Sequence, residues 1–158
     1  MPAADFLLLG FYPAALCTCI GTDIARRIIP NAVIAALLLG FAGLAFLTPL
    51  SDLSLRLLLA AAVTGLGFFL FAENVVGAGD AKLAGALTLW MDPAQLPLFV
   101  LASGLIGGVL SLAAYAMDGS GQRSDRAIAV PARTIPYGVA LAGAGLLLHP
   151  FSSLLGGG

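Results

Sequence analysis

The sequence predicts an all-α polytopic membrane protein with about six transmembrane helices. Of its 158 residues, 60% are hydrophobic and only 9% are charged, whereas a soluble domain usually carries about 25% charged residues. The few charges also divide the chain into apolar segments, and about 20 apolar residues suffice to cross a hydrocarbon layer of about 30 Å. The composition therefore excludes a water-soluble globular protein, and we expect the lipid bilayer to surround the chain.

Six apolar segments are candidate helices, and together they form a single transmembrane domain over residues 1–158. They cover roughly residues 6–22, 31–50, 57–72, 81–91, 94–117 and 135–149. The first has no basic residue before it and no small-x-small cleavage site, so we expect a retained helix and not a secretory signal. The fourth is short, because residues 81–91 would reach only about 17 Å before Pro93 breaks the helix.

The basic residues indicate whether the fourth segment crosses, because cytoplasmic loops collect Lys and Arg. If all six segments cross, six of the seven basic residues share one side, and only Arg56 lies on the other. The six are Arg26, Arg27, Lys82, Arg123, Arg126 and Arg133. If the fourth segment turned back, the asymmetry would fall to three against four. We therefore predict six spans, with both termini outside and the loops after the first, third and fifth helices in the cytoplasm.

Composition and spacing also exclude several kinds of site. A formal net charge of −1 leaves no basic surplus for nucleic acid, so we expect no nucleic-acid partner. Cys17 and Cys19 are spaced C-x-C without a second pair or a nearby His, so we expect two buried inert thiols, no metal and no cofactor. Gly104-x-x-x-Gly108 has the small-residue spacing that lets helices approach closely, and we expect it to pack internally rather than in a dimer.

Two acids stand out, because ionisable residues at membrane depth cost free energy that an apolar residue would avoid. Asp23 lies at the cytoplasmic end of the first helix and Asp80 at the cytoplasmic start of the fourth, so topology places both at the same depth. Two neighbouring carboxylates share one proton, which provides one base and one acid for amide hydrolysis. Their lateral distance depends on whether the two helices are neighbours.

Each acid also has a structural interpretation. Asp80 follows Gly77-Ala78-Gly79, and glycines there permit φ > 0 and a close backbone approach that places the acid off the end of its helix. Alternatively, Asp80 caps the fourth helix at the positive end of its dipole. Asp23 is otherwise a solvated helix end or a local ion pair with Arg26 and Arg27.

Together these features resemble the type IV prepilin peptidase family of polytopic aspartic proteases. Asp23, with the basic stretch and the Ile-Pro-Asn that follow it, looks like the family's first catalytic Asp. Asp80 looks like the second, in the family's Gly-x-Gly-Asp (GxGD) motif followed by Lys-Leu, and residues 135–138 look like the opening of its last helix. The motif residues besides the two acids are Pro30, Asn31, Gly77, Gly79, Lys82, Pro136, Tyr137 and Gly138.

The resemblance implies a membrane aspartic endopeptidase that cleaves the basic leader from pilin or pilin-like precursors. It implies a place in the bacterial cytoplasmic (inner) membrane, a site at the cytoplasmic face, and pilus assembly machinery as a further partner. Larger members carry a cytoplasmic insert with paired cysteines and methylate the new N-terminus. Here the loop after the first helix is about eight residues and lacks cysteine. The chain therefore looks like the short tight-adherence (Flp-type) branch, without methyltransferase activity.

Two other classes of protein remain open from the residues. In a small transporter subunit, Asp23 and Asp80 would carry protons or cations, and Gly77 to Asp80 would be an unwound stretch. The Ile-Pro openings at 29–30 and 135–136 begin the second and sixth helices, which an inverted repeat would not pair. In an inactive assembly subunit, the shared depth of the two acids would be a coincidence.

Overall fold

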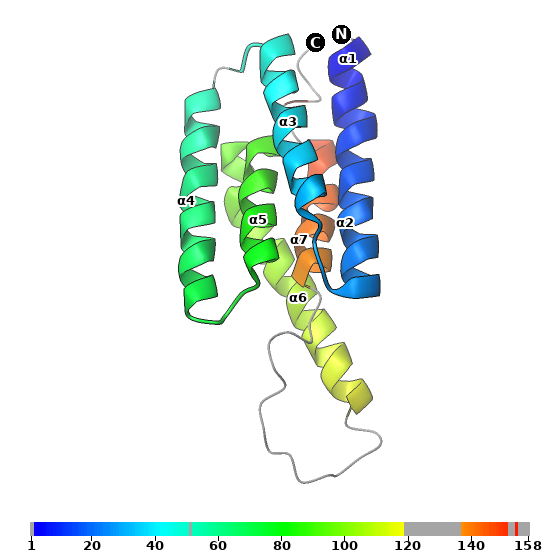
Figure 1. The fold of residues 1–158 in the computed structure, drawn as a ribbon. Helices are drawn as coiled ribbons and strands as arrows, with labels where there is room; N and C mark the ends of the chain where they lie inside the picture. Colours follow the sequence, from blue (N-terminus) through cyan, green and yellow to red (C-terminus); the bar gives the residue numbers. More distant parts are fainter. Residues whose placement is uncertain (1, 51, 119–136, 152–153, 155–158) are drawn as a thin grey trace.

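The computed structural model describes residues 2–50, 52–118, 137–151 and 154, and every regular element among them is helical. The chain begins with one continuous rod formed by α1 (Pro2–Asp5), a π-helical stretch η1 (Phe6–Phe11) and α2 (Tyr12–Arg26). It continues with α3 (Asn31–Leu47), α4 (Leu53–Ala72) and α5 (Ala78–Trp90). A 3-10 turn η2 (Pro93–Gln95) leads into α6 (Leu96–Asp118), and α7 (Tyr137–Leu148) ends in η4 (His149–Phe151). Successive helices run in alternating directions (Figure 1).

The short fourth segment becomes the centre of the bundle. Helix α5 packs against α3, α4 and α7, and eight of its thirteen residues are buried. At its end, the Trp90 indole stacks on Tyr12 with ring centroids 4.9 Å apart and donates a hydrogen bond to the Leu37 carbonyl oxygen at 3.1 Å. Because protein surrounds α5 on several sides, its shortness does not leave its ends exposed to lipid.

Three described helical stretches are long and apolar enough to cross a membrane: Ala3–Arg26, Leu53–Ala72 and Pro93–Ala114. Asn31–Leu47 and Tyr137–Phe151 are shorter apolar helices. Large hydrophobic side chains on α4 and α6 lie exposed, among them Leu58, Leu66, Leu101 and Val109. This supports a membrane protein, while six complete crossings and the side on which the termini lie stay predictions.

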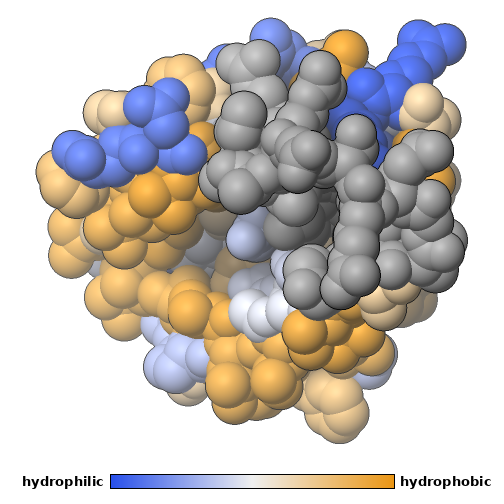
Figure 2. Space-filling view, turned by 90° about the horizontal axis from the view of Figure 1, so that it is seen from below, coloured by the Kyte–Doolittle hydropathy of each residue, from blue (hydrophilic) through white to orange (hydrophobic). Residues whose placement is uncertain are grey.

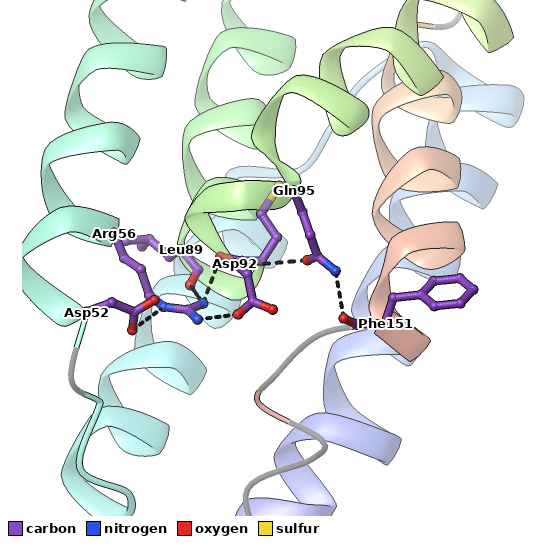
Figure 3. A network of polar contacts seen from close by, with 7 residues as sticks. Asp52, Arg56, Leu89, Asp92, Gln95 and Phe151 are labelled. Atoms are coloured by element: carbon purple, nitrogen blue, oxygen red, sulfur yellow. Dashed lines mark hydrogen bonds and ion pairs between the residues drawn. The ribbon is translucent and has the colours of Figure 1, made fainter.

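The helix boundaries differ from the predicted ones where charged residues lie inside helices. Helix α2 continues to Arg26, so Asp23 lies within its last turns, and α4 begins at Leu53, so it includes Arg56. The Arg56 side chain is only 1% exposed and forms ion pairs with Asp52 (2.9 Å) and Asp92 (2.6 Å). It also donates hydrogen bonds to the carbonyl oxygens of Leu89 and Met91 (Figure 3). Charge counting alone places this arginine in a loop, whereas it ties α4 to the end of α5.

Two packing predictions were wrong in part. Cys19 is buried as expected, but Cys17 is exposed, because it lies on the outer side of α2. A Cβ added at Gly104 or Gly108 would meet no described atom within 4 Å, so this pair does not form the internal contact that its spacing predicted. At the end of the molecule with Arg56, the His149 ring is buried and bonds the Leu8 carbonyl oxygen at 2.7 Å.

Candidate active site

Asp23 is held at the junction of α2 and α7. It is 5% exposed, and its Oδ2 accepts a hydrogen bond from the backbone N–H of Val139 at 3.0 Å. The chain turns away just after it, where Arg27 adopts the left-handed conformation (φ 53°) and donates its N–H to the Asp23 carbonyl oxygen at 2.9 Å. The carboxylate thus lies at the N-terminus of α7, where free backbone N–H groups attract an anion.

Asp80 lies in the first turn of α5, just before the apolar segment 81–91. Gly77 is the N-cap residue, so Asp80 is the third residue of the helix, and its carboxylate interacts with the Gly77 backbone. Asp80 thus lies at the positive end of the α5 dipole without being its N-cap, and the same side chain lines a cavity with Asp23. Burial, and secondarily the negative charge of Asp23, raises the pKa of Asp80 to about 6.

The two acids share one cavity of about 670 Å³ at the end of the bundle where α2, α5 and α7 meet. Helix α7 packs against both α2, which carries Asp23, and α5, which carries Asp80. It therefore brings the two acids to one site without a direct contact between α2 and α5 being needed. Figure 2 views the molecule from this end, where paler residues lie in a recess among hydrophobic ones. The predicted shared depth therefore corresponds to a shared cavity.

Lys82 and Asn31, both predicted as motif residues, meet at the cavity wall. The Lys82 Nζ donates a hydrogen bond to Asn31 Oδ1 at 3.2 Å, and both residues line the cavity. Pro30 lies outside the cavity lining and is the N-cap of α3. The hydrogen bond between Lys82 and Asn31 links the start of α3 to the first turns of α5.

The glycines of the motif are needed for space and not for positive φ. No glycine among the described residues has a positive φ, so the prediction of a left-handed conformation before Asp80 was wrong. Instead, a Cβ at Gly77 would lie 2.7 Å from Asp80 Oδ2, and one at Gly79 would lie 3.4 Å from the Cβ of Ile29. The predicted close approach is correct, and Asp80 stays inside its helix.

The third motif contributes two described residues to the site. Tyr137 lines the cavity. Its ring packs against α6 at Gly107, where an added Cβ would lie 3.4 Å from the ring. A Cβ at Gly138 would lie 2.7 Å from Asp23 Oδ2. Pro136 lies outside the described residues.

Several lining residues were not predicted. Phe71 lies in the last turn of α4, Asn74, Val75 and Val76 follow the helix, and together they form one wall. Asn74 has a positive φ of 60°, which asparagine tolerates better than most residues. In the sequence these residues directly precede the Gly-x-Gly-Asp motif, and this position is the signal that could have identified them as cavity residues.

An apolar helical bundle with a cavity lined by two carboxylates defines the class as a membrane protein with an acid-lined polar site at one end. A comparison with known families matches residues 10–112 to the type IV leader peptidase family. The match covers more than half of the chain, so the chain belongs to the type IV leader peptidase family and is a leader peptidase-type protease. Tyr137 and Gly138 lie beyond the matched residues. Neither the curated proteins nor the solved structures gave a match.

Proposed function

We propose that the protein is an aspartic endopeptidase that uses Asp23 and Asp80 with one activated water to cleave the leader from pilin-type precursors. The observation that carries this proposal is the cavity lined by both carboxylates in a chain of the leader peptidase family. A pair of nearby acids holds one proton over a wide pH range. We assign the shared proton to Asp80, whose pKa is raised by burial and by the negative charge of Asp23.

The reaction then follows from the two protonation states. The ionised Asp23 takes a proton from a water molecule, whose oxygen attacks the carbonyl carbon of the scissile amide. The protonated Asp80 donates to the carbonyl oxygen as the C=O bond opens. When the tetrahedral intermediate collapses, Asp23 gives its proton to the departing amine as the C–N bond breaks, and Asp80 takes back the hydroxyl proton as the C=O bond re-forms. The hydrogen bond from Val139 to Asp23 Oδ2 holds the base in one orientation throughout.

The proposed substrate has a basic leader followed by an apolar helix. If the cavity faces the cytoplasm, the leader approaches from that side, and the junction meets the acids where the membrane begins. We place the protein in the bacterial inner membrane, in the Flp-type branch. The short turn between α2 and α3, residues 27–30, leaves no room for a cysteine-bearing insert, so we propose leader cleavage without methylation.

The test is co-expression with a candidate Flp-type pilin precursor, with leader loss followed on a gel. Asp23→Asn and Asp80→Asn should each abolish processing while the protein stays in the membrane at parental amounts. Asp52→Asn is the control, because Asp52 pairs with Arg56 away from the cavity. Normal processing by both cavity variants would refute the dyad.

The family assignment favours a peptidase over the transporter alternative. A transporter with this site would move protons or cations in vesicles that contain no precursor. The Asp80→Asn variant separates the two, because loss of ion flux without loss of processing would favour transport.

A further inference from the structure

A second hollow begins at Asp80 and runs along the outside of the bundle. It is an apolar groove of about 310 Å³ between α4 and α6, with α5 and α7 as its floor. Along α4 it extends from Val63 to Leu70, which at 1.5 Å per residue is about 10 Å. Its length therefore corresponds to about two turns of a helix.

The groove and the acid-lined cavity are continuous. Val76, Asp80 and Tyr137 line both hollows, so these three residues mark the boundary between them. On the cavity side, Lys82 and Asn31 contribute polar groups. On the groove side the walls are almost entirely apolar, and the Ser103 hydroxyl donates to the Val100 carbonyl oxygen within its own helix.

Small residues make the groove suitable for a helix. Its floor includes Ala81, Ala84 and Ala140, and Gly67 and Gly104 lie in the α4 and α6 walls. A Cβ at Gly104 would meet no described atom within 4 Å, so nothing in the described chain fills this side. Leu66 and Val100, each 60% exposed, form the rims. Small floors between larger rims allow a helix backbone to approach closely in lipid.

We propose that this groove receives the apolar helix of the precursor, and that its end at Asp80 places the scissile bond. The inference rests on the proposed function, since it assigns the two hollows to the two parts of that substrate. A precursor with a polar leader and an apolar helix changes character at the cleavage junction. The enzyme changes from a polar cavity to an apolar groove at Asp80.

Gly104→Leu tests the groove, and Gly108→Leu is its matched control. Both glycines lie on α6 without a described neighbour within 4 Å of an added Cβ, but only Gly104 lines the groove. With a membrane-inserted precursor, we expect Gly104→Leu to slow leader cleavage by about tenfold or more, and Gly108→Leu to stay within about twofold of the parent. Equal rates for the two variants would overturn the groove, whereas a parent that cleaves no precursor would overturn the proposed function itself.

Cross-linking supplies a second measurement that does not depend on tolerance of leucine. Gly104→Cys or Gly108→Cys is placed in a Cys17→Ser background, because Cys17 is exposed and Cys19 is buried. The precursor carries one cysteine in the first two turns of its apolar helix, and Asp80→Asn prevents turnover. We expect a precursor adduct at position 104 and none at 108. An adduct between two copies of the enzyme without a precursor adduct would instead assign the groove to a dimer and overturn the proposal.

Discussion

At the scale of single residues, Gly138 determines how closely α7 approaches Asp23. An added Cβ would lie 2.7 Å from Asp23 Oδ2 and 2.9 Å from its Cγ, closer than packed atoms tolerate. The carboxylate would have to move away from the Val139 N–H that now holds it. Because small displacements of a reacting group are costly, we expect Gly138→Ala to reduce the rate of precursor cleavage by about 10- to 100-fold.

The matched control for this prediction is Gly143→Ala in the same helix. Its added Cβ would lie 3.6 Å from the Ile106 Cδ1, an ordinary contact, so processing should stay within about twofold of the parent. Both variants are compared by processing rate at equal amounts of membrane-inserted protein. Parental processing by Gly138→Ala would show that the position of Asp23 is not critical.

The sequence was informative about the two acids and less so about what holds them. Asp23 and Asp80 stand out because charges are scarce in an apolar chain, and both line one cavity. The hydrogen bond from Val139 joins residues 116 positions apart, and a backbone donor leaves no trace in residue identity. Gly138 was found only through the family resemblance, because its role is the absence of a side chain.

At the scale of elements, the close contact between α4 and α5 at Gly67 and Ala81, which we call the seam, positions Asp80. A Cβ at Gly67 would lie 2.8 Å from the Cβ of Ala81 and 3.0 Å from its Cα. The backbone of Ala81 cannot move without shifting α5 and the adjacent Asp80. We therefore expect Gly67→Ala to destabilise the protein by about 1–3 kcal/mol through overpacking, measured as a lowered thermal midpoint in detergent, with slower precursor cleavage.

Gly65→Ala is the matched control, because it makes the same substitution on α4 at a position that does not face α5. No described atom lies within 4 Å of its added Cβ, so only helix propensity changes, and alanine is favoured by up to about 1 kcal/mol. The two variants should shift the thermal midpoint in opposite directions. A shift of the same sign and size in both would contradict the role assigned to the seam.

The Arg56 network fixes the other end of the same two helices. Arg56 is buried and holds two carboxylates and two carbonyl oxygens, so its removal leaves polar groups without their cationic partner. We expect Arg56→Met to cost about 3–5 kcal/mol of unfolding free energy, as when one member of a buried ion pair is lost.

Asp52→Asn provides the comparison for Arg56. The Asp52 side chain is 32% exposed, and a pair with such a solvated partner contributes only about 0–1 kcal/mol. Chemical unfolding in detergent should therefore give Arg56→Met a much lower free energy of unfolding than Asp52→Asn. Because the network lies away from the cavity, both should bind precursor with the parental KM at low temperature. Equal stability of the two variants would contradict the network's structural role.

Helix existence was easier to predict than helix ends. The scarcity of charges located six helical segments, but it placed the start of the third at residue 57, after Arg56, because a lone arginine was taken as a loop residue. In the structure, Asp52, Asp92 and two carbonyl groups satisfy Arg56 inside the bundle. Such pairing depends on contacts between distant segments, which a charge count along the chain does not contain.

At the scale of the whole molecule, basic residues that the structure describes lie at both ends of the helical bundle. Arg27 and Lys82 line the acid-lined cavity at one end, and Arg56 lies at the end of α5 remote from Asp80. Three more arginines lie at positions 123, 126 and 133, which are outside the described residues. The positive-inside rule then predicts a cytoplasmic cavity.

This topology predicts the outcome of reporter fusions. A reporter active only in the cytoplasm, inserted in the 118–134 loop, should be active, and one inserted at residue 51 between α3 and α4 should not. Shifting the charge bias tests the cause: Arg123→Gln, Arg126→Gln and Arg133→Gln together should weaken the cytoplasmic signal, because they halve the basic residues on that side. An inactive reporter in the 118–134 loop of the parent would place α5 as a segment that does not cross. The 118–134 loop would then lie outside, while Asp23 and Asp80, which come before α5 crosses or turns back, would stay on the cytoplasmic side, and the prediction of six spans would be wrong.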